Sequence, residues 1–193
     1  MYNLPHFKAD NQREIFAFMQ AHPFATLCCV DAHGCPVATH IPVLFEEREG
    51  VLYLQAHIMR KQDHAIALAT NPNVLVIFSA NHAYVSASWY AKQNVASTWN
   101  YKAVHAKGIV RFLNDEGLYN MLVKLTNHFE GSVDSPAAVK YMSDEYVRDN
   151  MKAIVGFEIE LTSINNVFKQ SQNKDAETKK AIIKQLGSDS LVK

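Results

Sequence analysis

The sequence has few cysteines and no excess charge of either sign. Its three cysteines, Cys28, Cys29 and Cys35, form no CxxC pair and no Cys/His zinc spacing. Secreted disulfide frameworks use an even set, so we expect a reducing compartment, the cytoplasm. Nineteen basic residues balance nineteen acidic ones. A neutral chain lacks the broad basic surface typical of nucleic-acid binding, so DNA contact would need a local patch.

Long apolar runs and motifs of common catalytic sites are also missing. The N-terminal stretch "MYNLPHFKADNQ" has no apolar core, which argues against a secretory signal, and no run is long enough to span a bilayer. The chain contains no GxSxG, no P-loop and no HExxH, and its nine histidines form no compact set with acidic residues. We therefore assign no catalytic residue and no metal site, and we expect no membrane partner.

Short alternating segments with turns between them are what the sequence does contain. With 48% hydrophobic residues in 193, the composition fits one globular domain over residues 1–193. A hairpin is predicted where two such segments flank Asp31–Gly34. A chain of mainly β-strands, with helices at the periphery, favours a closed or nearly closed antiparallel barrel. The predicted strands cover residues 24–30, 35–45, 51–58, 74–80, 83–87, 99–113 and 155–161.

Helical spacing dominates the last third of the chain. Apolar residues recur every three or four positions from Leu118 to Phe129, which predicts an amphipathic helix over 115–129. A second helix over 143–153 completes a helical segment of about 115–153, and a C-terminal helix covers about 175–187, with Gly187 as its stop. Two further helices are predicted at 11–20 and 60–70.

The stretch "AHIMRKQDHA" carries two cations where a helix is predicted to begin. Arg60 and Lys61 would lie in the first helical turn, where free backbone N–H groups favour an anion. Basic residues at that end oppose the helix dipole, so their presence indicates a bound negative group such as a phosphate. The alternative is that both are solvated surface charges.

Polar side chains also interrupt two predicted strands. In "VATHIPVL", Thr39 and His40 point to opposite faces and could donate hydrogen bonds to the edge of a ligand. The alternative, and the commoner case for a lone histidine at a barrel rim, is that its hydrogen bonds are made within the protein. In "TWNYKAVHAKG", Trp99 and Asn100 also lie on opposite faces, beside more polar groups than packing needs. The late run "FKQSQNK" reads as a polar connector.

Taken together, these stretches resemble the PaiB-type family of FMN-binding split-barrel proteins. The resemblance rests on "MYNLPHF", "PFATL", "ATHIPVL", "HIMRK", "HAYVSASWY", "TWNYKAVHAKG", "IVGFEI" and "SQN", which occur in the family's order over nearly the whole chain. It implies an antiparallel split β-barrel that forms a homodimer, with two FMN sites at the seam between subunits. The cofactor-binding residues that it implies are Thr39, His40, His57, Arg60, Lys61, Trp99, Asn100, Lys169, Gln172 and Asn173.

The resemblance also limits the function. Members of the family are commonly labelled negative transcriptional regulators, which implies an FMN-binding, redox-responsive regulator. The alternatives are an FMN-dependent oxidoreductase of the pyridoxamine phosphate oxidase or flavin reductase class, and a haem-binding or haem-degrading protein of related fold. On this reading the polar edge of "TWNYKAVH" faces a cofactor, and Asn100→Ala should leave the free energy of unfolding within about 1 kcal/mol of the parent.

Overall fold

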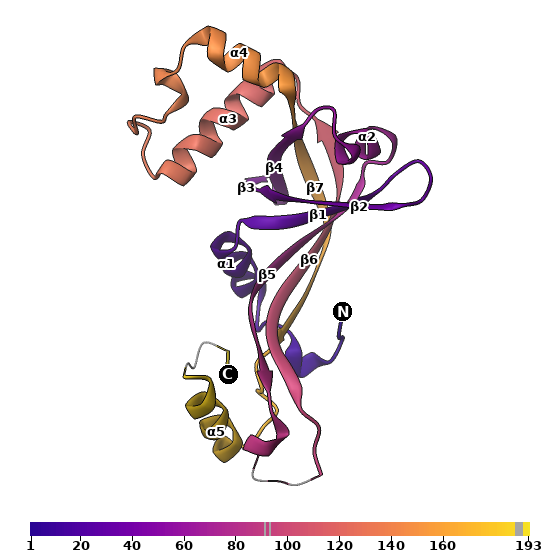
Figure 1. Ribbon diagram of the computed structural model, residues 1–193, viewed down its shortest axis with the longest axis vertical. Helices are drawn as coiled ribbons and strands as arrows, with labels where there is room; N and C mark the ends of the chain where they lie inside the picture. Colours follow the sequence, from indigo (N-terminus) through magenta and orange to yellow (C-terminus); the bar gives the residue numbers. More distant parts are fainter. Residues whose placement is uncertain (91, 93, 188–190) are drawn as a thin grey trace. The chain divides into compact units, whose positions relative to one another are not determined.

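The computed structural model describes residues 1–193 except 91, 93 and 188–190 (Figure 1). The chain divides into two compact units, and each is described by itself. The terminal unit contains both chain ends, and the central unit contains the segments between. Whether the chain acts as one domain stays a prediction. The terminal unit comprises Met1–His22, Phe78–His105 and Asn165–Lys193, and the central unit comprises Pro23–Ile77 and Ala106–Ile164.

A seven-stranded sheet runs through the described residues in the order β2-β1-β5-β6-β7-β4-β3. The pairings β1–β2, β1–β5, β3–β4 and β4–β7 are antiparallel. The predicted antiparallel, mainly β fold is therefore confirmed. The strands are β1 Phe24–Val30, β2 Pro36–Pro42, β3 Leu44–Arg48, β4 Val51–Met59, β5 Asn73–Val85, β6 Thr98–Phe112 and β7 Ile154–Lys169.

Three predictions of strand boundaries are wrong. The strand expected at 35–45 is divided into β2 and β3, because Val43 lies outside both. The segments expected at 74–80 and 83–87 belong to the single strand β5, which ends at Val85, and the strand expected at 155–161 continues to Lys169 as β7. Asn81 and His82, which lie between the two expected segments, are inside β5. A strand needs only extended backbone and ladder partners, so polar side chains on an exposed stretch do not end it.

The predicted hairpin opens the central unit. Asp31 shapes its turn because its Oδ1 accepts hydrogen bonds from the backbone N–H groups of His33 and Cys35, each at 2.8 Å. Gly34 has φ of +82°, a left-handed conformation that glycine adopts without strain. In β1 the side chains of Ala25, Leu27 and Cys29 are buried, as the strand's alternation predicts.

Two helices lie side by side in the central unit, α3 (Asp115–Glu130) and α4 (Asp144–Ala153) (Figure 1). Asn114 caps α3 by accepting from the Gly117 N–H at 2.8 Å, and Ser143 caps α4 by accepting from the Tyr146 N–H at 3.2 Å. A short 3₁₀ turn, Val139–Tyr141, precedes α4. The predicted helices at 115–129 and 143–153 are confirmed. The remaining helix of this unit, α2, covers Asp63–Thr70.

The terminal unit combines parts of β5, β6 and β7 with helices α1 (Gln12–Ala21) and α5 (Ala176–Leu186). Both helices begin where the sequence places a cap. Asn11 accepts from the Glu14 N–H, and Asp175 accepts from the Thr178 N–H. The short turns Pro5–Phe7 and Ala87–Trp89 complete this unit. Its core contains Met19, Val85, Val104, Val167, Phe168 and Ile182.

None of the described helices combines the length and the apolar character that a membrane crossing requires.

Candidate functional site

The ten predicted cofactor-binding residues fall into two sets of five. Thr39, His40, His57, Arg60 and Lys61 belong to the central unit, and the second set belongs to the terminal unit. Each set is therefore considered within its own unit. The second set consists of Trp99, Asn100, Lys169, Gln172 and Asn173.

The Arg60–Lys61 turn lies between β4 and α2. The prediction that α2 begins at residue 60 is wrong, because the helix begins at Asp63 and Gln62 is its N-cap. An acidic residue in the first turn suits the positive end of the helix dipole, whereas two cations oppose it. Arg60 and Lys61 thus lie in the turn before the helix, not in its first turn.

The end of α4 holds Arg60. The backbone N–H of Arg60 donates to the Ala153 carbonyl oxygen at 2.9 Å, and its side-chain Nε donates to the Lys152 carbonyl oxygen at 3.2 Å. The last carbonyls of a helix lack partners within the helix, and cations interact favourably with that end. These two bonds fix the direction of the guanidinium group and leave its remaining N–H groups for other acceptors.

A cationic pocket of about 560 Å³ opens beside this turn, lined by Arg60, Asp115, Arg148, Met151 and Lys152. Three of these residues carry positive charge and one carries negative charge. Arg148 and Lys152 make exposed ion pairs with Asp144 at 3.9 Å and Asp149 at 2.8 Å. Pairs in solvent are weak, so they leave both cations available to an anion. We refer to these five lining residues as the cationic pocket.

Sequence reasoning missed Arg148 and Lys152. They lie 88 and 92 residues after Arg60, on another helix, and no local motif connects them to it. One signal was present, because residues four apart on a helix share a face, so Arg148 and Lys152 had to point to the same side of α4.

Thr39 and His40 occupy β2, opposite Leu27 and Thr26 of β1. Thr39 is half-buried and His40 is exposed. The His40 ring stacks near Phe24, with 6.0 Å between ring centroids. Lys61 is exposed in its turn. These residues are accessible, and their role toward a cofactor stays a prediction.

His57 differs from its neighbours because its imidazole is largely enclosed. Burial lowers the pKa of His57 below its ordinary value, which keeps the ring neutral. Its Nδ1 is buried and has no hydrogen-bond partner among the described residues. A buried polar atom without a partner is costly, and in native structures it calls for an explanation.

In the terminal unit, Asn100 is the centre of a buried polar network. Its side chain is 0% exposed, and its Nδ2 donates to Ser171 Oγ at 2.9 Å and to the Leu191 carbonyl oxygen at 2.8 Å. Ser171 Oγ in turn donates to Asn100 Oδ1 at 3.1 Å. The expectation that Asn100 behaves as a surface residue is wrong, because both ends of its amide group are bonded inside the chain.

Ser171 is the network member that sequence reasoning missed. It is 2% exposed and adopts φ of +60°, a left-handed conformation that a residue with a side chain rarely takes. The surrounding structure has to hold such a residue in place, and its bond to Asn100 does so. The "SQN" motif marked this position, but the Asn100 contact spans 71 residues and leaves no local pattern.

Trp99 and Asn100 point to opposite faces of β6, as predicted. Trp99 is 51% exposed, and its ring lies 5.5 Å from His82 and 5.6 Å from Tyr84, measured between ring centroids. This exposed aromatic cluster (His82, Tyr84 and Trp99) offers a flat apolar surface. Solvent-facing aromatic groups of this kind suit stacking against a planar ligand.

The late polar run is largely engaged with its own chain. Lys169 Nζ donates to Thr98 Oγ1, and burial, with a smaller contribution from Lys174, lowers the pKa of Lys169. Gln172 Oε1 accepts from the Gln170 N–H at 2.7 Å. Asn173 is exposed. Of the three predicted residues here, Asn173 is the one with an open side chain.

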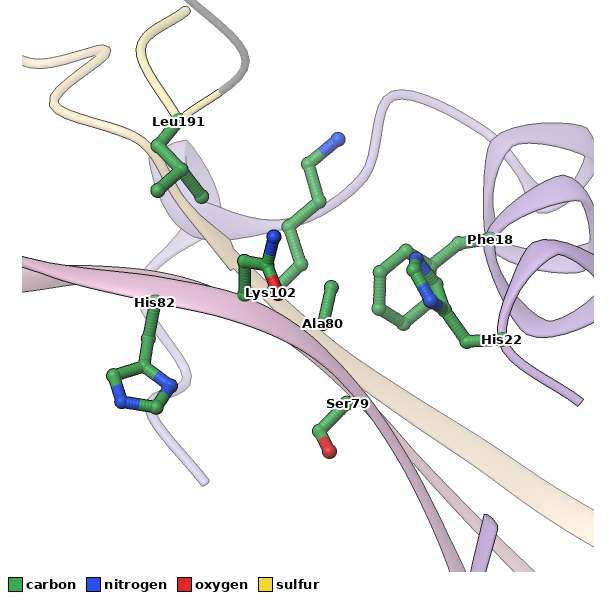
Figure 2. A pocket seen from close by; sticks show the side chains of 8 residues that line it. Phe18, His22, Ser79, Ala80, His82, Lys102 and Leu191 are labelled. Atoms are coloured by element: carbon green, nitrogen blue, oxygen red, sulfur yellow. The ribbon is translucent and has the colours of Figure 1, made fainter. Parts of the chain in front are cut away.

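A larger pocket of about 920 Å³ also lies within the terminal unit (Figure 2). Figure 2 shows Phe18 and His22 side by side on one wall, and their ring centroids are 4.6 Å apart. Lys102 supplies a cation, which lies 4.9 Å from the centroid of the Phe168 ring. Aromatic walls with one cation fit a planar anionic group. The remaining lining residues are Ser79, Ala80, Asn81, His82 and Leu191.

Comparison with known proteins connects this geometry to a family. A family model described as "Putative FMN-binding domain" matches residues 1–163. The chain belongs to this FMN-binding family. The match confirms the predicted family and the predicted flavin cofactor. It covers the Arg60–Lys61 turn, Trp99 and Asn100, and it ends before the 169–173 run.

A curated relative of this FMN-binding protein aligns over nearly its full length, and another aligns over about half of it. It is 33% identical over 189 residues to "Protease synthase and sporulation protein PAI 2" of Bacillus subtilis, covering 98% of this chain and 90% of the relative. It is also 35% identical over 100 residues to the uncharacterized protein YKL070W of Saccharomyces cerevisiae, covering 48% of this chain and 59% of the relative.

Solved structures share the fold at low sequence identity. The FAD and heme binding protein from Mycobacterium smegmatis aligns with a TM-score of 0.65 at 19% identity, covering 88% of this chain and 77% of that one. The flavocytochrome Anf3 from Azotobacter vinelandii aligns with a TM-score of 0.65 at 18% identity, covering 92% and 77%. These neighbours confirm the split-barrel class of the FMN-binding protein.

The buried network makes a stability prediction. Asn100→Ala removes two donated bonds and leaves Ser171 and the Leu191 carbonyl without a partner, so the free energy of unfolding should fall by about 1–3 kcal/mol. Denaturant unfolding of Asn100→Ala, Ser171→Ala and the double variant measures this loss and the coupling between the pair. Trp99→Ala, at an exposed position on the same strand, is the control. An unchanged unfolding free energy together with weaker flavin binding would contradict the structural role.

Proposed function

We propose that this protein binds FMN with the phosphate group in the cationic pocket. The convergence of Arg60, Arg148 and Lys152 on one pocket is the observation that supports this proposal. A phosphate dianion needs charge-assisted donors, and arginine presents several in a fixed plane. Asp115 also lines the pocket, so the formal net charge of its lining residues is about +2. That charge would balance one phosphate dianion.

The flavin ring needs an apolar wall and donors along its edge. Thr39, His40 and Lys61 are accessible in the central unit, and the exposed aromatic cluster around Trp99 supplies a stacking surface. We assign these residues to the two sides of one flavin site, built at the seam of a homodimer, with Asn173 as a further polar contact. An isologous twofold interface is the commonest way to build such a shared site. When bound, the flavin supplies reversible electron transfer, and the protein positions it.

The function that this supports best is a redox-responsive transcriptional regulator in the cytoplasm. The near full-length similarity to a protein named for protease synthesis and sporulation favours regulation over metabolism. The chain's formal net charge of zero requires that any DNA contact come from a local basic patch. An FMN-dependent oxidoreductase is the alternative, and DNA binding distinguishes the two.

Phosphate recognition can be tested with two ligands that differ by the phosphate group. Arg60→Ala with Arg148→Ala, both in the cationic pocket, should weaken FMN binding about a hundredfold or more, since each charge-assisted bond contributes about 1.5–3 kcal/mol. Riboflavin, which has no phosphate, should lose little affinity. Flavin fluorescence titration measures both. Lys180→Ala with Lys184→Ala removes the same charge from exposed positions of α5 and should leave both affinities unchanged. Equal losses for FMN and riboflavin would refute phosphate contact.

Regulation predicts sequence-specific DNA binding that depends on the flavin. Selection from random DNA with the FMN-loaded protein should enrich one sequence, and reduction of the flavin with dithionite should change its affinity at least about tenfold, or about 1.4 kcal/mol. The Arg60→Ala, Arg148→Ala variant, which should carry no flavin, should show no response to dithionite. If neither redox state enriches a sequence, the oxidoreductase alternative replaces the regulator.

The shared site predicts a dimer in solution. Static light scattering at micromolar concentration should give about twice the chain mass of 21.7 kDa. Trp99→Glu places a charge in the proposed seam and should shift the protein toward the monomer, with flavin affinity falling in parallel. The matched change Tyr119→Glu, on the exposed side of α3, should do neither. A monomeric parent protein that still binds FMN tightly would exclude the seam.

A further inference from the structure

A second cavity lies on the other side of α4 from the cationic pocket. It measures about 330 Å³, at the small end of the range for ligand sites, and is bounded by β4, β7, α3 and α4 of the central unit. None of its described lining residues carries a formal charge when His57 is neutral. They are His57, Met59, Leu122, Thr126, Val139, Met142, Tyr146, Val147, Asn150, Ala153 and Ile154.

Two features of this neutral cavity indicate a ligand. The unpartnered Nδ1 of His57 belongs to a ring that lines the cavity, so a bound group could supply the missing hydrogen bond. The apolar side chains around it are also unusually open, since Met59 is 50% exposed and Tyr146 is 59% exposed. Apolar groups around a cavity, with a buried polar atom inside, are what small-molecule sites share.

The lining also defines the chemistry of the ligand. A charged group would have no counter-charge there and would be desolvated, which is expensive. A neutral imidazole carries one N–H and one bare nitrogen, and which of them is Nδ1 depends on the tautomer. A hydroxyl group can both donate and accept, so it satisfies either tautomer. We propose that this neutral cavity binds an uncharged ring compound that carries one hydroxyl group.

This site is separate from the proposed flavin site. The FMN phosphate requires the cations of Arg60, Arg148 and Lys152, and none of these residues lines the neutral cavity. The proposal assigns His57 to this second ligand in place of the flavin edge that the family resemblance implies for it. Because Lys152 and Ala153 are consecutive residues that line different pockets, a ligand in the neutral cavity contacts the segment that holds Arg60.

The methionines allow a direct test with phenol as the probe. The chain has six methionines, of which Met59 and Met142 line the neutral cavity and Met151 lines the cationic pocket. In the FMN-loaded protein with ¹³C-labelled methionine methyl groups, phenol should shift the NMR signals of Met59 and Met142 and leave those of Met19 and Met151 in place. Toluene, which lacks the hydroxyl, should bind about three- to tenfold more weakly, and benzoate, which is charged, should not bind.

Two variants then isolate His57. His57→Phe keeps a ring and removes the nitrogen, so phenol should lose its advantage over toluene while FMN affinity stays unchanged. His57→Gln retains a polar amide and should preserve part of that advantage. The proposal is overturned if phenol leaves Met59 and Met142 unshifted, if FMN displaces it, or if His57→Phe weakens FMN and not phenol. The comparison of phenol, toluene and benzoate on the parent protein holds even if a variant fails to fold.

Discussion

The antiparallel register of β4 with β7 determines where the candidate site residues His57 and Arg60 of the central unit lie. The pairing runs from Tyr53 opposite Glu160 to Met59 opposite Ile154. Because it ends there, the next residue on each strand, Arg60 and Ala153, must meet, and the Arg60 N–H donates to the Ala153 carbonyl. The Arg60–Lys61 turn is thus joined to the C-terminal end of α4. A one-residue slip of this register would turn each β4 side chain to the opposite face of the strand.

Helix α4 divides two environments of different charge. Arg148, Met151 and Lys152 line the cationic pocket, whereas Tyr146, Val147 and Asn150 line the neutral cavity. Successive side chains on a helix turn by about 100°, so a short helix can present a charged side and an apolar side within three turns. Helical amphipathicity usually separates solvent from core. Here both sides of the helix line cavities, which explains why no residue of α4 is fully buried.

Local patterns predicted most of the fold and only part of the site. The apolar spacing from Leu118 to Phe129 and the stop at Gly187 are signals within a few residues, and they gave the helices correctly. The prediction of where α2 begins was wrong, because Arg60 and Lys61 extend the helical pattern of the sequence while their backbone forms the turn after β4. Arg148 and the Asn100–Ser171 bond could not be predicted. Arg148 lines a pocket with Arg60, which lies 88 residues earlier, and the bond spans 71 residues.

In strand β6, two adjacent residues have opposite surroundings. Adjacent residues of a strand face opposite sides, so Trp99 can stay exposed while Asn100 is enclosed. Asn100 fastens Ser171 and Leu191, which both lie beyond the residues that the family model matches. Asn100 and Trp99 of "TWNYKAVH" therefore differ in their surroundings. One face secures the C-terminal part of the chain, and the exposed ring of Trp99 on the other face remains available to a planar ligand.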